Sequence, residues 1–354
     1  MTKVAVINDT HCGIRNASEI FLENAERFYS EIFFPYLLEH NIKQILHLGD
    51  YYDNRKVVNI KAINHNRHVF LNKLREYGIT MDIIPGNHDC FWKNKNDLNS
   101  LKEFLGHYMN EVNIIEDPTV LKYGNLDIGL VPWINQENED QMMEFIRTCK
   151  APVLGGHFEL EGFDLMKGRK SDHGMNMAPL KKFDLVMSGH YHTKSSQENI
   201  HYLGSQMEFT WSDAHDKKYF HILDTDTIEL TAIHNPITLH QRLIYDDINK
   251  PYDYTKLPNL DKKFVKVIIL NKYDAAAFDA FLDRINEYDI YGLKIAEKFD
   301  DYLGESVSDE DVSLEDTLDT LDSYVDAVIT DLDRSRLKNN MRELYTIAQA
   351  LEIQ

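Results

Sequence analysis

Short apolar runs alternate with amphipathic stretches through the first 235 residues of the chain. Apolar residues recur at helical spacing in three stretches, roughly 19–40, 60–77 and 97–109. Strands that alternate with helices predict an α/β layered fold. The early strand candidates are Val4–Asn8, Gln44–Leu48, Thr80–Ile84, Leu126–Val131, Pro152–Gly155 and Leu185–Ser188. Later candidates follow one another without a helix, so we expect a mixed sheet; they are Ile200–Leu203, Lys218–Asp224 and Ile228–Ile233.

The pattern changes after Pro236. Residues 240–262 contain two prolines and are predicted to be irregular. A strand, a helix and a second strand are then predicted at Phe264–Leu270, Asp274–Tyr288 and Tyr291–Glu297. These elements indicate a small α+β unit. We therefore place a first domain at residues 1–238 and a second domain at residues 239–299.

The C-terminal residues are first acidic and then amphipathic. Residues 300–312 are rich in acidic residues with glycine and serine, which is typical of a flexible linker. In residues 313–354, apolar residues recur at three- and four-residue steps, which predicts two amphipathic helices. The stretch from Asp300 to Asp333 holds thirteen acidic residues and no Lys or Arg, so it carries −13 of the net charge of −20. The rest of the chain is only mildly acidic, and the charge does not exclude a nucleic-acid substrate.

Five short motifs place polar residues directly after apolar strand candidates. They are Asp9-Thr10-His11-Cys12-Gly13, Gly49-Asp50-Tyr51-Tyr52-Asp53, Gly86-Asn87-His88-Asp89, Gly155-Gly156-His157 and Gly189-His190-Tyr191-His192. Ligand sites in α/β sheets form at the carboxyl ends of strands, so we expect these motifs to converge. Each motif alone is a weak signal, because a lone histidine is more often structural than a ligand. Their combination in this order is specific.

The potential metal ligands in these motifs are two aspartates, one asparagine and four histidines. Oxygen and imidazole ligands suit manganese, iron or zinc better than a thiolate-selected site. Seven ligands are too many for one metal and suit two metals that share a carboxylate. Two cations about 4 Å apart hold a phosphate, generate a hydroxide and neutralise developing charge. We therefore predict a dinuclear metal centre that hydrolyses phosphoesters.

Cysteine usage and hydropathy indicate the compartment. The three cysteines, Cys12, Cys90 and Cys149, have no CxxC spacing, which favours a reducing cytoplasm over a disulfide framework or zinc ribbon. No apolar run approaches the length of a membrane span, and the N-terminus opens directly into a strand candidate rather than a signal peptide. We expect a cytoplasmic protein without membrane contact.

The five motifs resemble those of the calcineurin-like metallophosphoesterase superfamily over roughly residues 4–195. The chain as a whole is similar to the nuclease subunits of double-strand-break-repair complexes (the SbcD type), a group with members in large tailed bacteriophages. This resemblance implies a four-layered α/β/β/α fold, a small α+β capping domain at residues 239–299 and C-terminal helices. It also implies 3′-to-5′ exonuclease activity on duplex DNA ends and endonuclease activity on single strands. Two Mn²⁺ ions are the expected cofactors, with Mg²⁺, Fe²⁺ and Zn²⁺ as alternatives.

The resemblance also implies a role for each polar residue of the motifs. One metal would be held by Asp9, His11 and His192, and the other by Asn87, His157 and His190, with Asp50 bridging the two. His88 would stabilise the pentacovalent transition state or protonate the leaving oxygen. Asp53 is placed to orient His88, as carboxylates often do for histidines.

Two clusters of basic residues near the motifs, the first of which also contains a tryptophan, are candidates for DNA contact. They are Trp92, Lys93 and Lys95 after the third motif, and Lys167, Arg169 and Lys170 after the fourth. Aromatic and basic side chains suit base stacking and phosphate contact. The alternative is that Trp92 packs in the structure and that the lysines are ordinary solvated surface.

The resemblance further implies partner proteins. The expected partner is an ABC-type ATPase with a long coiled coil, bound through residues 313–354, where amphipathic helices suit docking into a groove. ATP would act only through that partner, because this chain has no Gly-x-x-x-x-Gly-Lys-Ser/Thr loop. A homodimer is also implied, and residues 60–77 are the surface we nominate for it.

Three other functions compete with a DNA nuclease. A phosphomonoesterase is disfavoured, because protein phosphatases of the superfamily have Gly-Asp-x-x-Asp-Arg-Gly where this chain has Asp53-Asn54-Arg55-Lys56. A small-molecule phosphodiesterase is compatible with the same metal site. A non-catalytic scaffold is disfavoured, because every expected ligand position is occupied by a suitable residue.

Overall fold

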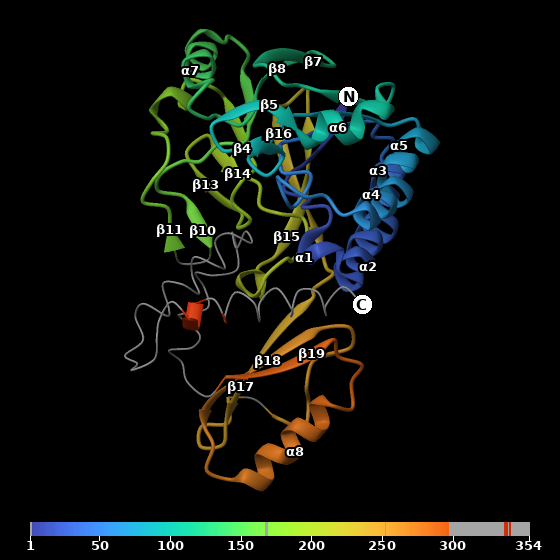
Figure 1. The fold of residues 1–354 in the computed structure, drawn as a ribbon, viewed down its shortest axis with the longest axis vertical. Coiled ribbons are helices and arrows are strands. Elements are labelled where there is room, and N and C mark those ends of the chain that lie inside the picture. The colour runs from blue at the N-terminus through green and yellow to red at the C-terminus, as the bar shows by residue number, and fades with distance from the viewer. Residues whose placement is uncertain (1, 167–168, 252, 297–335, 339, 341–354) are drawn as a thin grey trace. The chain divides into compact units, whose positions relative to one another are not determined.

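The computed structural model describes residues 2–166, 169–251, 253–296, 336–338 and 340 (Figure 1). The chain divides into two units, Met1–Ile295 and Ala296–Gln354. The predicted acidic linker, 300–312, lies outside the described residues, and so does the predicted helical segment 313–354 except for 336–338 and 340.

Two mixed six-stranded sheets form the centre of this unit. The first has the strand order β16 (Glu229–Asn235), β15 (Lys218–Asp224), β1 (Lys3–Ile7), β2 (Gln44–His47), β3 (Thr80–Ile83) and β6 (Val112–Ile114). The second has the order β13 (Ser195–Gln197), β14 (Ile200–Tyr202), β12 (Leu185–Ser188), β9 (Val153–Gly156), β8 (Leu126–Val131) and β7 (Thr119–Tyr123). Neighbours from β1 to β6 and from β8 to β14 are parallel, and the flanking strands are antiparallel. The predicted mixed sheet and all nine strand candidates before residue 236 are confirmed, with small shifts at their ends.

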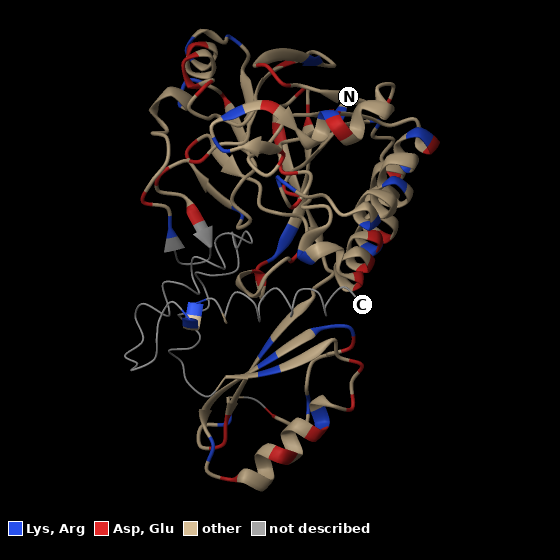
Figure 2. Ribbon diagram, in the orientation of Figure 1, with Lys and Arg blue, Asp and Glu red and all other residues tan. Residues whose placement is uncertain are grey.

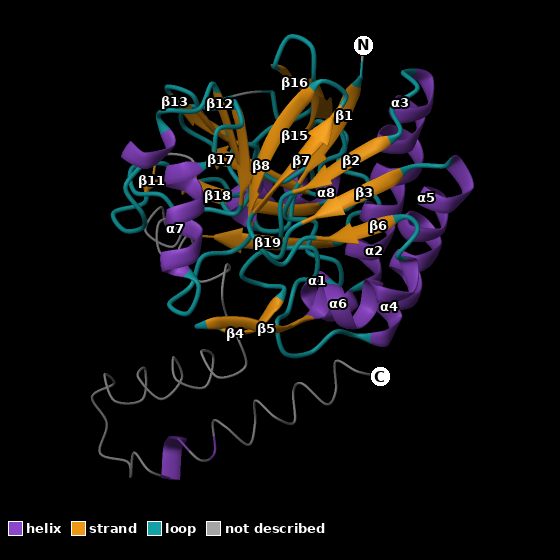
Figure 3. Cartoon of the chain, turned by 90° about the horizontal axis from the view of Figure 1, so that it is seen from above, coloured by secondary structure: helices purple, strands orange, loops and turns teal. Residues whose placement is uncertain are grey.

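The two sheets pack face to face, with helices on both outer faces. Val4 and Val6 of β1 face a core shared with Ile128 and Leu130 of β8, whereas Ala5 and Ile7 face the helices. Because both faces are buried, such strands appear in the sequence as continuous apolar runs. Figure 3 shows the helical layers on opposite sides of the sheets. This is the expected α/β/β/α arrangement.

The helical layer on the first sheet follows two of the predicted amphipathic stretches. It consists of α2 (Glu19–Arg27), η1 (Phe28–Phe33), α3 (Phe34–Glu39), α4 (Ile60–Asn66), η2 (Arg67–Leu71) and α5 (Asn72–Tyr77). Its buried side is aromatic and includes Phe28, Phe33 and Phe70, none of which has exposed area. Acidic and basic residues are interspersed along these helices (Figure 2), as in the pair Lys73–Glu76. The opposite layer is α7 (Glu139–Thr148), an amphipathic helix that the sequence pattern did not reveal.

A three-stranded sheet completes the described part of the first unit. It has the order β17 (His240–Asp246), β18 (Phe264–Asn271) and β19 (Gly292–Ala296), and α8 (Ala275–Ile285) packs on it through Phe278 and Phe281. The prediction that residues 240–262 are irregular was wrong for their first part, because β17 pairs in parallel with β18. Leu243 and Tyr245 are its buried apolar residues. The division into domains at residues 238 and 239 stays a prediction, since both parts lie within one compact unit.

The remaining elements are short. They are α1 (Ile14–Ala17), β4 (Cys90–Trp92), β5 (Lys95–Asn99), α6 (Ser100–Leu105), η3 (Gly106–Tyr108), β10 (Asp164–Met166), β11 (Arg169–Lys170), η4 (Ala178–Leu180) and η5 (Trp211–Asp213). The hairpin of β4 and β5 matters for the site, because it begins two residues after His88. Within the described residues, no helix combines the length and apolar character needed to cross a bilayer.

Candidate metal centre

The parallel strands bring all five motifs to one edge of the two sheets. Asp9 follows β1, Asp50 follows β2 and Asn87 follows β3, and these strands are direct neighbours in the first sheet. In the second sheet, His157 and His190 follow the adjacent strands β9 and β12. Parallel strands end on the same side, so their loops meet there. Backbone hydrogen bonds join the loops, for example from Asp9 N to Gly49 O at 2.9 Å.

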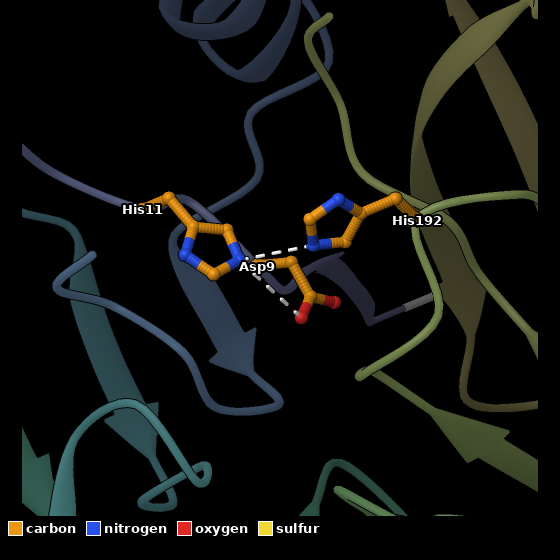
Figure 4. Close-up of side chains that lie close together, drawn as sticks. All are labelled: Asp9, His11 and His192. Carbon is orange, nitrogen blue, oxygen red and sulfur yellow. Dashed lines mark hydrogen bonds and ion pairs between the residues drawn. The ribbon is translucent and has the colours of Figure 1, made fainter. Parts of the chain in front are cut away.

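One group of potential ligands combines Asp9, His11 and His192 (Figure 4). The Nε2 atoms of His11 and His192 lie 3.0 Å apart, and His11 Nε2 is 4.0 Å from Asp9 Oδ1. The Asp9 carboxylate also accepts the backbone N–H of His190 and is bonded by Asn8 Nδ2 at 2.5 Å. Three side chains from two distant loops therefore point their donor atoms at one place.

A second group combines Asp50, His157 and His190, with Asn87 between the two histidines. Asn87 Oδ1 lies 3.0 Å from His157 Nε2 and 3.0 Å from His190 Nδ1. Asp50 Oδ2 lies 3.3 Å from His157 Nε2, and Asp50 Oδ1 accepts the backbone N–H of His88 at 2.8 Å. The seven predicted ligands thus form two adjacent groups, as the resemblance implied, and their coordination of metals stays a prediction.

Several ligands adopt backbone conformations that are costly for residues other than glycine. Asp9, His11, Asp50 and His190 have φ values of 46°, 42°, 54° and 92°. Such conformations cost of order 1–3 kcal/mol each and persist only where the surrounding structure imposes them. Their concentration at one edge of the sheets indicates a functional site.

Two glycines permit the close approach of these loops. Gly49 has φ 90°, and a Cβ atom there would lie 2.6 Å from His157 Nδ1. A Cβ on Gly86 would lie 2.1 Å from Asp50 Oδ1. No side chain fits at either position without displacing a potential ligand.

Burial and neighbouring charges shift the pKa values of the cluster in different directions. Burial lowers the pKa of His190 to about 3 and that of His192 well below the ordinary value, so both rings are neutral and carry a lone pair at pH 7. Burial and the nearby Asp50 charge raise the pKa of Asp9. Burial alone would also raise the pKa of Asp50, but His157 and His88 hold it well below the usual range.

The orientation of His157 tests whether these residues fit a metal. Its Nδ1 lies 2.8 Å from the backbone carbonyl of Leu48 and must donate, because that carbonyl has no proton. Nε2 therefore faces the oxygens of Asp50 and Asn87 with its lone pair, unless a cation or a proton lies between them. Burial opposes protonation, yet the charge of Asp50 raises the pKa of His157 to about 9. The arrangement demands a positive charge at this point, and a divalent cation meets that demand.

His88 and Asp53 lie beside the two groups. His88 Nδ1 lies 2.5 Å from the backbone carbonyl of Asp53, which fixes the ring and leaves Nε2 as the nitrogen directed away from that carbonyl. The Asp53 carboxylate lies 3.5 Å from His11 Nδ1. The residue thus contacts His88 through its main chain and a potential metal ligand through its side chain. Sequence reasoning had assigned only the contact with His88.

Asp89 is a positioning residue that the sequence reasoning did not single out. Its buried carboxylate accepts the backbone N–H groups of Tyr51, Tyr52 and Gly86 at 2.9–3.2 Å. These bonds hold the loop of Asp50 against the loop of Asn87. The signal was present, because Asp89 ends the Gly-Asn-His-Asp motif, but its role depends on contacts between two loops.

We expect Asp89→Asn to lower the affinity for Mn²⁺ by about 10- to 100-fold, as is typical for residues that orient metal ligands. The amide would turn N–H donors toward backbone N–H donors and loosen the loop of Asp50. Calorimetric titration with Mn²⁺ measures the effect. Asp97→Asn, on the exposed face of the β4–β5 hairpin, is the matched control. Unchanged Mn²⁺ affinity in Asp89→Asn would contradict this role.

Two aromatic residues that the sequence did not indicate also contact the potential ligands. The Trp133 ring lies 5.4 Å from the His190 ring and 5.8 Å from the His157 ring, between centroids. Phe209 packs at 5.4 Å and 5.6 Å against His11 and His192. Neither residue belongs to one of the five motifs, because both reach the site from other loops.

The predicted DNA-contacting residues are only partly described. Trp92 is 45% exposed on the β4–β5 hairpin, and Lys95 Nζ lies 5.4 Å from its ring centroid. Lys93 is exposed on the same hairpin. Lys170 is exposed on β11, the side chain of Arg169 is not described, and Lys167 lies outside the described residues. Asn96 of the hairpin donates to the Trp133 carbonyl at 3.1 Å, which links the hairpin to the ligand groups.

This combination of sheets, motifs and ligand groups defines a metallophosphoesterase. The sequence profile described as calcineurin-like phosphoesterase matches residues 2–194. The chain belongs to this family.

The chain is also similar to individual known proteins. The chain is 31% identical over 349 residues to exonuclease subunit 1 of Enterobacteria phage T4, covering 98% of this chain and 99% of that protein. It is 30% identical over 103 residues to the SbcD subunit of the nuclease SbcCD from Staphylococcus epidermidis, which covers 26% of each chain. A solved archaeal phosphodiesterase covers 66% of this chain and all of its own, at 14% identity and a TM-score of 0.34.

Proposed function

We propose that this phosphoesterase is a metal-dependent DNA nuclease. The observation that carries the proposal is the similarity, from end to end, to a phage protein named as an exonuclease subunit, together with the two ligand groups. The activities proposed are 3′-to-5′ exonuclease activity on duplex ends and endonuclease activity on single strands. A scaffold without catalysis is disfavoured, because every predicted ligand lies in one of the two groups or between them.

The proposed chemistry divides between the metals and the chain. Two divalent ions, with Mn²⁺ the first choice, supply a hydroxide nucleophile and neutralise the charge of the phosphate when they are bound. Asp9, His11 and His192 would hold one ion, and Asn87, His157 and His190 would hold the other, with Asp50 as a ligand common to both. His88 presents Nε2 to the substrate, because its Nδ1 is engaged by Asp53 O. From that position it stabilises the transition state or donates a proton to the leaving oxygen.

The exposed hairpin favours DNA over a small phosphodiester. Trp92 is 45% exposed and offers its ring to a base. Lys93, and Lys95 with its Nζ paired to Asp97, offer charge for the backbone. The hairpin follows His88 directly and is tied to Trp133 at the ligand groups. A strand held by this hairpin is therefore held close to the metals.

The test compares two substrates under the same conditions. End-labelled duplex DNA and an aryl phosphomonoester are each incubated with the full chain in Mn²⁺, and the Asp50→Asn protein reports any contaminating activity. We expect cleavage of DNA with little turnover of the monoester. If the monoester turns over rapidly and the DNA stays intact, the protein is a phosphomonoesterase and not a nuclease.

We also propose that the chain works as a subunit. Both named relatives are described as subunits, one of them of a nuclease called SbcCD. We further propose that the partner is an ABC-type ATPase with a coiled coil, bound through residues 313–354. A homodimer through residues 60–77, which form α4, η2 and α5, belongs to the same proposal.

A further inference from the structure

A cavity of about 570 Å³ lies in the three-stranded part of the first unit, remote in sequence from the five motifs. It is formed by the end of β17, the loop that follows it and the start of α8. The residues that matter are three tyrosines and three aspartates, Tyr245, Tyr254, Tyr273, Asp247, Asp253 and Asp274. Nothing in the proposed nuclease chemistry uses this cavity.

The tyrosines form an aromatic wall. The rings of Tyr245 and Tyr254 stack with centroids 5.1 Å apart and an interplanar angle of 18°. Tyr245 is 1% exposed and is wedged against Phe278 and Phe281 of α8. Tyr245 and Tyr254 are therefore held by the core of this part of the chain, whereas Tyr273 is 80% exposed.

Two buried oxygens at the cavity lack hydrogen-bond partners within the described residues. They are the hydroxyl of Tyr245 and Oδ1 of Asp247. The other oxygen of Asp247 is used, since it accepts the backbone N–H groups of Tyr273 and Asp274 at 2.5 and 2.7 Å. A buried polar atom without a partner costs about 1–3 kcal/mol. Such atoms in a native fold indicate a missing ligand, ion or water.

The charge of the cavity favours a cationic ligand over an anionic one. Its lining, in the part of the chain that the structure describes, holds three carboxylates and the cation Lys250, and it stays net acidic although Lys256 pairs with Asp253 at 3.6 Å. Burial raises the pKa of Tyr245, and the charge of Asp247 raises it further, which keeps the phenol neutral and able to donate or accept. An anionic ligand would be repelled, whereas a group rich in N–H donors would satisfy the carboxylate oxygen.

We propose that this cavity binds an ammonium or guanidinium group carried on an aliphatic stem. The N–H groups bond Asp247 Oδ1 and the Tyr245 hydroxyl, and the more exposed rings of Tyr254 and Tyr273 attract the cation through their π faces. This chemistry is offered by a free polyamine and by the side chain of an arginine or lysine in a partner protein. Titration with free amines and with an arginine peptide distinguishes these two sources.

The test is calorimetric titration of the full-length protein without added metal. The probes are agmatine, spermidine and a blocked Gly-Arg-Gly peptide, and a Gly-citrulline-Gly peptide serves as the uncharged match. We expect the cationic probes to bind and the citrulline peptide not to bind. Tighter binding of the arginine peptide than of the free amines assigns the site to a protein side chain, and the reverse order assigns it to a polyamine.

Two variants locate the binding. Asp247→Asn keeps an oxygen for Tyr273 and Asp274 but turns an N–H donor toward the site, so we expect at least about tenfold weaker binding. Tyr245→Phe keeps the packed ring and removes the hydroxyl, with an expected loss of a few fold. Asp279→Asn, on the exposed side of α8, removes the same charge outside the cavity and should bind as the wild type does. Equal melting temperatures confirm that the variants are folded.

Two outcomes would overturn the proposal. If no cationic probe binds the wild-type protein, the two oxygens are satisfied by water alone. If Asp247→Asn and Asp279→Asn bind alike, the probes associate only with the general negative charge of the chain. Neither outcome depends on nuclease activity, so the proposal stands or fails separately from the proposed function.

Discussion

Replacement of Asp50 by asparagine is expected to lower the rate of phosphodiester hydrolysis by about 1000-fold or more, which corresponds to ~4 kcal/mol in the activation barrier. Asp50 is 2% exposed, and its carboxylate contacts His157 and the backbone of His88. An uncharged amide would remove the negative charge that favours a cation beside His157 and would thereby weaken metal binding. The fold should persist, because asparagine tolerates the φ of 54° at this position.

The measurement is single-turnover cleavage of end-labelled duplex DNA in Mn²⁺, with thermal unfolding of the same preparation. Asp127→Asn, an exposed aspartate on β8, is the matched control and should retain full activity. An Asp50→Asn protein that cuts DNA within tenfold of the wild-type rate would show that Asp50 does not bridge the metals.

Replacement of Lys218 by methionine is expected to lower the free energy of unfolding by about 3–5 kcal/mol. The ammonium of Lys218 is 2% exposed and pairs with the buried carboxylate of Asp213. It also donates to the backbone carbonyl of His192 at 3.0 Å, so it holds the loop of a potential ligand. Methionine fills the space of the stem but leaves Asp213 charged and buried without its partner.

Urea denaturation at pH 7 measures this loss in the free energy of unfolding. The loss depends on pH because it requires Asp213 to be ionised. Burial alone would raise the pKa of Asp213, but Lys218 lowers it to about 2. The stabilisation is therefore complete above the ordinary pKa of aspartate, about 3.9, and is lost as the pH falls toward 2. Lys217→Met, at the exposed neighbouring position, is the control and should unfold as the wild type does. A loss below about 1 kcal/mol in Lys218→Met would mean that water replaces the ammonium.

Much of the site could be predicted from local pattern, because each ligand follows a buried strand. Asp9, Asp50 and Asn87 stand directly after apolar runs, and parallel strands must end on the same side. The runs themselves are clear because both faces of the central strands are buried, as Val4 and Ala5 of β1 show. The glycine and histidine residues of the five motifs were also sufficient to predict the family.

Other features depended on contacts that local pattern does not encode. β17 was missed because its apolar positions are few, and it is a strand only through its pairing with β18. α7 was missed although its Met142 and Ile146 belong to the core cluster that packs on the second sheet. Asp89 and Trp133 act through neighbours in other loops. The oxygens of Tyr245 and Asp247, which have no partner among the described residues, come together at a cavity formed by the end of β17, the loop after it and the start of α8.

The sequence by itself determined which residues could serve as ligands and which strands carry them, since both follow from residue type and periodicity. The division of the ligands into two groups, which the family resemblance implied, arises from contacts that only the tertiary structure decided. His11 meets His192 across 181 positions, and His157 is oriented by the carbonyl of Leu48 across 109 positions. Such contacts arise from the packing of one sheet on another, and no spacing within a motif fixes that packing.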